Sequence, residues 1–174
     1  MDYFLLKQDE RYTNTPRLMD VFKKINLKNL NLLNAHKIED VTIFEVSADD
    51  NCEFLDILDS QLFLILEGMK KIIEKYDRDI LFKSLALIDS LHDRQENYFL
   101  PIFEEIEALS DNAELNLDKT VVKKIVLDKE KIQGKKIFKV KESLKQLIVV
   151  RLDVAESLLR RDFKGIKLER LQVD

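Results

Sequence analysis

Few residues of this chain could carry acid–base or metal chemistry: two histidines, His36 and His92, and one cysteine, Cys52. They lie far apart in the sequence and lack the short spacings that zinc ligands show. Asp93 directly follows His92 and could orient its imidazole, with Arg94 as the next residue. General acid–base catalysis also needs a pocket and a substrate-side partner, and the sequence supplies neither. We therefore predict no catalytic residues, no metal site and no cofactor.

Nucleophilic and phosphate-binding sites are not indicated either. Cys52 is surrounded by Asp49, Asp50 and Glu53, and nearby carboxylates raise the pKa of a thiol and oppose its ionisation. Glycine-rich phosphate loops need clustered glycines, whereas Gly68, Gly134 and Gly165 are scattered singly. Cys52 is better explained as a packing residue at the start of a helix.

Composition bounds the class of protein. The chain has 174 residues, of which 45% are hydrophobic and 36% charged, which predicts one folded domain over residues 1–174. Any minor seam within the domain would fall in the acidic stretch 110–118. The net charge of −4 offers no basic excess for nucleic acid. A single cysteine, no secretory signal and no apolar run of about 20 residues predict a cytoplasmic protein without a membrane span.

Charge is distributed unevenly along the chain. Every charged residue from Glu96 to Asp118 is acidic, and lysine dominates from Lys119 to Lys145. One interpretation is an acidic surface that binds a protein partner, and the other is two neighbouring elements whose opposite charges face each other. The arginines near the end of the chain could bind an acidic partner or simply compensate a helix dipole. The candidate partner-binding residues are Glu104, Glu105, Glu107, Asp111, Glu114, Arg160 and Arg161.

The clearest local pattern lies near the end of the chain. Residues 147–150 predict a strand, 153–163 a helix, and 166–168 a second strand after a stop at Gly165. Asp153 could cap the helix with Glu156 three residues later, as in a capping box. Short joints between the elements suggest a crossover between parallel neighbouring strands.

Elsewhere the pattern predicts strands at 3–6, 41–46, 80–88, 121–127 and 137–140, and an edge strand or an extended connection around Pro101. A short helical stripe covers 18–25, and the Asn- and Leu-rich tract 26–34 is ambiguous. Apolar residues spaced by three and four from Leu55 to Tyr76 predict one long amphipathic helix. The expected fold is α+β: a single mixed sheet packed against this helix, with a C-terminal strand–helix–strand unit.

Two stretches, Tyr3–Lys7 and Val149–Leu168, resemble a family of bacterial immunity proteins from polymorphic-toxin systems (family eleven). Members of that family often begin with a short Tyr-rich strand followed by Leu-Lys, and close with strand, helix and a Gly-Ile or Gly-Val turn. The resemblance implies a non-enzymatic cytoplasmic protein that binds and blocks a cognate toxin domain. Two alternatives stay open: a small-molecule enzyme of unknown class centred on His92, or a self-associating structural protein built on the 55–76 helix.

Overall fold

The computed structural model describes all 174 residues, Met1–Asp174, and it is dominated by strands. About 36% of the residues lie in strands and 14% in helices, distributed over several sheets and three short α-helices. The expected single sheet against one long helix is therefore wrong.

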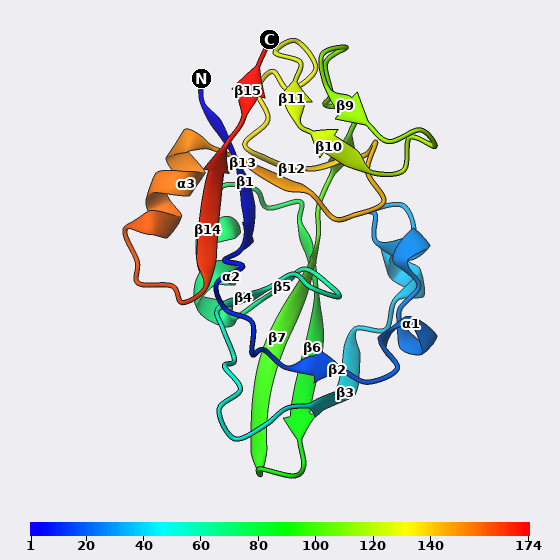
Figure 1. The fold of residues 1–174 in the computed structure, drawn as a ribbon, viewed down its shortest axis with the longest axis vertical. Helices are drawn as coiled ribbons and strands as arrows, with labels where there is room; N and C mark the ends of the chain where they lie inside the picture. Colours follow the sequence, from blue (N-terminus) through cyan, green and yellow to red (C-terminus); the bar gives the residue numbers. More distant parts are fainter.

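The first sheet has five strands in the order β14-β1-β13-β12-β8. Its strands are β1 (Tyr3–Gln8), β8 (Glu105–Ile106), β12 (Ile137–Val140), β13 (Ile148–Arg151) and β14 (Ile166–Arg170). The helix α3 (Leu152–Leu159) connects β13 to β14 on one side of this sheet (Figure 1). The expected strand–helix–strand unit is thus present. Its two strands run parallel but are not neighbours, because β1 lies between them and pairs antiparallel with both.

The second sheet has six strands in the order β2-β3-β6-β7-β5-β4. Its strands are β2 (Arg17–Leu18), β3 (Val41–Ser47), β4 (Ile57–Leu58), β5 (Leu64–Ile65), β6 (Leu81–Asp89) and β7 (Arg94–Ile102). β6 and β7 form a long hairpin at one end of the molecule (Figure 1). Alternate residues of β6 are buried, which is the pattern of a strand with one face on the core.

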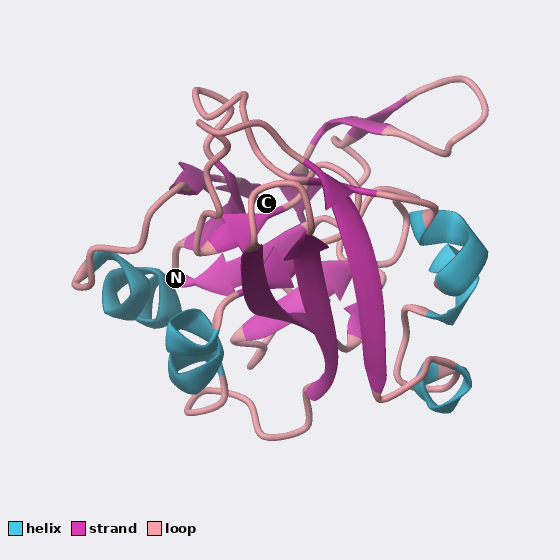
Figure 2. Cartoon of the chain, turned by 90° about the horizontal axis from the view of Figure 1, so that it is seen from below, coloured by secondary structure: helices cyan, strands magenta, loops and turns pink.

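Smaller elements complete the fold. β9 (Glu114–Leu115) pairs with β10 (Val122–Lys124), and β11 (Val126–Leu127) pairs with β15 (Gln172–Val173). The remaining helices are α1 (Val21–Lys24), α2 (Glu67–Ile73) and the 3₁₀ turns η1 (Leu27–Asn29) and η2 (Ala35–Lys37). The helices lie at the flanks of the strands, with α1 on the side away from α3 (Figures 1 and 2).

The long helix predicted over 55–76 is replaced by the hairpin β4–β5 and the short helix α2. The physical reason is burial on every side: both residues of β4 and both residues of β5 are inaccessible to solvent. A strand inside a protein buries both faces, whereas an amphipathic helix keeps one face in water. Gln61, between the two strands, also bonds to the backbone N–H and C=O of Leu18 through its amide.

Two local predictions are also corrected. Arg151, not Asp153, is the N-cap residue of α3, and no side chain caps the helix. Asp153 instead lies in the first turn and accepts two hydrogen bonds from Arg151, at 2.9 and 2.7 Å. Pro101 lies inside β7 rather than on an edge strand. The ladder tolerates it because β5 pairs with β7 only at Ile65 and Phe99, so Pro101 lies beyond that short partner.

One buried cluster joins the two sheets, with Leu6, Ile148 and Val150 from the first and Ile57 and Ile65 from the second. A second cluster packs the segment 18–38 against the second sheet. That segment supplies six of its buried residues: Leu18, Val21, Ile25, Leu30, Ala35 and Ile38. The segment is therefore held in place by these side chains and presents the others outward.

Candidate functional site

His92 lies in the turn between β6 and β7, but Asp93 does not orient it. Its Nδ1 lies 2.8 Å from an oxygen of Asp89, and its Nε2 lies 2.9 Å from an oxygen of Asp50. Asp93 has a positive φ of 51° and shapes the turn. Asp89 is missed by the sequence analysis, although it is the last residue of a strand whose alternate positions are buried.

Asp89 is the centre of this cluster and is only 1% exposed. Burial acts to raise its pKa, but hydrogen bonds from Arg94 and His92 outweigh that effect and hold the pKa below its ordinary value. Arg94 donates to Asp89 at 2.6 Å and to the carbonyl oxygens of Asp49 and Cys52 at 2.7 and 3.2 Å. The cluster thereby fastens the loop 49–52 to the end of the long hairpin.

Of the other residues weighed for chemistry, Cys52 lies beside this cluster, where its carbonyl oxygen accepts a hydrogen bond from Arg94. The thiol of Cys52 is buried, and burial is the main cause of the rise in its pKa. His36 lies exposed in η2, in a different part of the chain from His92. The arrangement of Asp89, His92 and Arg94 therefore positions a loop.

The structure brings the acidic stretch and the lysine-rich stretch face to face. β8 and β12 are parallel neighbours with Glu105 opposite Lys139, and these two side chains form an ion pair at 2.7 Å. The flanking residues Glu104 and Glu107 pair with Lys135 and Lys141 at 2.6 and 3.2 Å. The acidic and lysine-rich stretches are therefore neighbouring elements whose opposite charges face each other, which was the second interpretation of the charge pattern. Three of the predicted partner-binding carboxylates thus pair with lysines of the chain itself.

The remaining predicted partner-binding residues do not share one surface. Asp111 and Glu114 are exposed beside the β9–β10 hairpin. Arg160 and Arg161 are exposed at the end of α3, where Arg160 lies 3.9 Å from Glu156 and Arg161 donates to the carbonyl of Ser157. The hairpin and α3 lie on opposite sides of the molecule (Figures 1 and 2).

A different surface has the character of a binding site. Seven of the fourteen exposed large hydrophobic side chains fall in the single segment 19–43, which we call the apolar segment. They are Met19, Phe22, Leu27, Leu32, Leu33, Val41 and Ile43. Exposed apolar side chains mark an interaction surface where they lie together, as Phe22 and Leu27 do along one groove.

Local chemistry explains why the apolar segment forms short turns instead of a regular helix. The side chain of Asn26 accepts a hydrogen bond from the N–H of Lys28 at 3.0 Å and caps η1. Asn31 does the same for the N–H of Asn34 at 2.9 Å. Asparagine side chains compete with the helical backbone in this way and favour turns. These hydrogen bonds fix the conformation of the backbone that carries the exposed leucines.

A groove of about 920 Å³ separates the apolar segment from β12 and the turn that follows it. Phe22 and Leu27 line one wall, and Leu144 lines the other. The charged residues of the lining are six lysines and a single carboxylate, Glu105. The lysines are Lys23, Lys24, Lys28, Lys37, Lys139 and Lys141.

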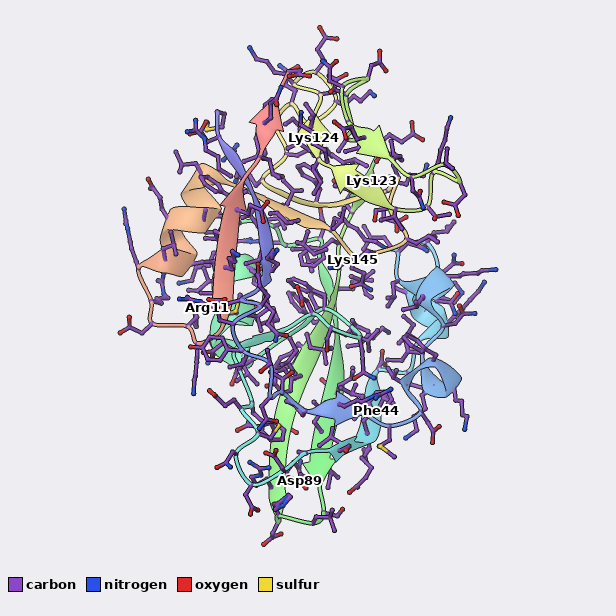
Figure 3. All side chains as sticks on the ribbon, viewed as in Figure 1. Arg11, Phe44, Asp89, Lys123, Lys124 and Lys145 are labelled. Carbon is purple, nitrogen blue, oxygen red and sulfur yellow. The ribbon has the colours of Figure 1, made fainter.

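Positive charge continues from the groove toward the β9–β10 hairpin. The N–H of Leu144 donates to the carbonyl oxygen of Thr120 at 3.2 Å, which joins the groove wall to the hairpin. Lys123 and Lys124, consecutive residues of β10, and Lys145 lie in the upper half of the molecule in Figure 3. We call the groove and these three lysines the basic face. The lysine-rich stretch was the sequence signal for the basic face, whereas residues 26–38 of the opposite wall carried no periodic signal.

Lys139 ties the two walls of the groove together. It is 8% exposed, and its ammonium donates to the carbonyl of Leu30 at 3.1 Å and to Glu105 at 2.7 Å. Replacing Lys139 by methionine should speed hydrogen exchange at residues 27–38 by about tenfold, because a hydrogen bond to a charged group contributes about 1.5 kcal/mol. Mass spectrometry of exchanged peptides measures this.

Lys141→Met is the matched control, since that lysine is 55% exposed and its ion pair with Glu107 is screened by water. It should leave exchange unchanged. Equal protection of 27–38 in wild type and Lys139→Met would mean that the segment is held by its apolar contacts alone.

A second cavity, of about 720 Å³, lies near the two ends of the chain. Tyr3 and Leu171 line it together with Arg151 and Arg170. Both arginines are already paired, with Asp153 at 2.7 Å and Asp2 at 3.0 Å. This cavity therefore offers fewer free charged groups than the basic face.

Comparison with known proteins finds no protein-family model that matches the chain, and no curated protein matches it in sequence. None of its helices combines the length and apolar character needed to cross a membrane. The geometry of the apolar segment and the basic face therefore carries the functional argument.

Proposed function

We propose that this chain is a non-catalytic binding protein that docks a partner protein on the apolar segment and the adjoining groove. Its role would be that of an immunity protein: direct binding to a cognate bacterial toxin domain, in the reducing cytoplasm. The concentration of exposed apolar side chains in residues 19–43 is the observation that carries this proposal. The resemblance of the two ends of the chain to immunity proteins suggests the class of partner.

Phe22 and Leu27 are the best candidates for binding anchors. They are 59% and 45% exposed, and both line the groove. Anchors that a partner can bury fully, surrounded by polar groups, supply most of the affinity of a typical interface. The lysines around these two side chains provide such a polar rim.

The test is co-expression with the toxin-like domain encoded by the neighbouring gene, followed by titration of the purified proteins. Phe22→Asp and Leu27→Asp should each weaken the complex by about thirtyfold, which corresponds to about 2 kcal/mol for a binding hot spot. Both side chains are exposed, so the fold should persist, and circular dichroism checks this.

Leu91→Asp is the matched control, because Leu91 is 88% exposed in the turn between β6 and β7, at the far end of the long hairpin. It should bind like wild type. The proposal is wrong if the neighbouring domain forms no complex, or if Leu91→Asp weakens binding as much as the groove variants. Concentration-dependent sedimentation of the chain alone would instead favour self-association through the same surface.

A further inference from the structure

The groove differs in charge from the molecule around it. The chain as a whole has a net charge of −4, whereas the lining of the groove holds six lysines and one carboxylate. Three of these lysines are neutralised within the chain: Lys23 by Asp20, Lys139 by Glu105 and Lys141 by Glu107. The excess positive charge therefore belongs to the other three.

Lys28 and Lys37 carry the free charge. Neither forms an ion pair, and neither ammonium makes a hydrogen bond within the chain, whereas Lys24 donates to the carbonyl of Ile43 and lies over the ring of Phe44. Like charges gathered at one concave surface repel each other and strengthen the local potential. An anionic occupant would relieve this repulsion without competing against an existing partner.

We infer that the groove receives an acidic segment of the partner protein, one that alternates carboxylates with large apolar side chains. Its carboxylates would pair with Lys28 and Lys37, while its apolar side chains would pack on Phe22, Leu27 and Leu144. The inference rests on the proposed function for the location of the site, and adds the chemistry of what binds there. Charge complementarity of this kind sets specificity and the rate of association more than affinity.

The composition of the lining favours a protein segment over a nucleic acid. The groove holds no arginine and only one aromatic side chain, Phe22. Proteins that bind single strands stack bases on several aromatic rings and commonly use arginine on phosphates. Aliphatic side chains such as Leu27 and Leu144 offer nothing to a phosphate backbone but pack well against leucine.

The test uses a displayed library of random twelve-residue peptides, selected on the wild-type protein. Enriched peptides should combine an excess of Asp and Glu with leucine or aromatic residues. A synthetic representative should bind at least tenfold more weakly to the double variant Lys28→Glu/Lys37→Glu, because two attractive contacts become repulsive. Raising the salt concentration from 50 to 300 mM should weaken the wild-type interaction.

The control variant is Lys71→Glu/Lys75→Glu, which reverses two exposed lysines of α2 and the turn after it, away from the groove. It should bind the peptide like wild type. The inference is overturned if the enriched peptides lack acidic residues, if the groove variant binds as tightly as wild type, or if a twelve-nucleotide oligo-uridine binds more tightly than any peptide. A complex with the toxin domain that is insensitive to Lys28→Glu/Lys37→Glu would likewise overturn it while leaving the proposed function intact.

Discussion

Replacing Gly165 by alanine should lower the free energy of unfolding by about 3 kcal/mol, because the change combines backbone strain with overpacking. Gly165 has a φ of +86°, which side-chain-bearing residues rarely adopt. A Cβ added there would lie 2.6 Å from Cδ1 of Leu55, a side chain with no exposed surface. The carbonyl of Gly165 also accepts a hydrogen bond from the N–H of Asp9 at 2.7 Å, so the backbone has little freedom to move. Urea denaturation measures the loss.

Gly134 provides a matched control for the same substitution. Its φ is +77°, close to that of Gly165, but an added Cβ would meet nothing within 4 Å. Gly134→Ala should therefore cost only the backbone strain, about 1 kcal/mol. Equal losses at the two positions would show that Leu55 moves aside and that packing contributes nothing.

Removing the carboxylate of Asp89 should lower the midpoint of thermal unfolding by about 10 °C in the Asp89→Ala variant, because a buried ion pair loses one partner. The side chains of Arg94 and His92 would then lose the carboxylate to which both donate hydrogen bonds. The loop 49–52 would then lose the charge that organises its contacts with the hairpin. Differential scanning calorimetry at pH 7 measures the shift.

The stabilising effect of Asp89 should also depend on pH. Because its pKa is lowered in the folded protein, the unfolded chain binds its proton first as the solution is acidified. The contribution is full above the ordinary value of 3.8 and is lost as the pH falls through the lower folded value. Wild type and Asp89→Asn should therefore converge in stability as the pH falls from 3.8 through the lower folded value. If the difference in free energy of unfolding between wild type and Asp89→Asn stays constant from pH 7 to pH 2.5, the charge of Asp89 contributes nothing and only the shape of its side chain matters.

The strands were the predictable part of this fold. Predictions at 3–6, 41–46, 80–88 and 137–140 are confirmed, because β-branched and apolar residues there are bounded by polar residues. The 55–76 helix failed because spacings of three and four also arise by chance in a densely apolar stretch. Only tertiary burial on all sides distinguishes a buried hairpin from a buried helix there.

The binding surface was not predictable, for a related reason. Acidic Glu105 and basic Lys139 are far apart in the sequence, and only the parallel register of β8 and β12 turns them into an ion pair. The free lysines and exposed leucines of 27–38 lie beyond the predicted helical stripe at 18–25, in a tract without periodicity, so the pattern could not decide which side chains face outward. Burial of Ile25 and Leu30 against the second sheet decides it.

The order of strands in the first sheet has a consequence for how the molecule assembles. β1 precedes both of its hydrogen-bonded neighbours by more than a hundred residues: Phe4 pairs with Val150 on one side and with Arg170 on the other. During synthesis on the ribosome β1 must wait, with both edges unpaired, until β13 and β14 have emerged. Long-range pairing of this type slows folding. It also leaves the backbone N–H and C=O groups of the unpaired strand free to pair with other chains. Nascent chains arrested before residue 147 should therefore depend on chaperones far more than the finished protein does.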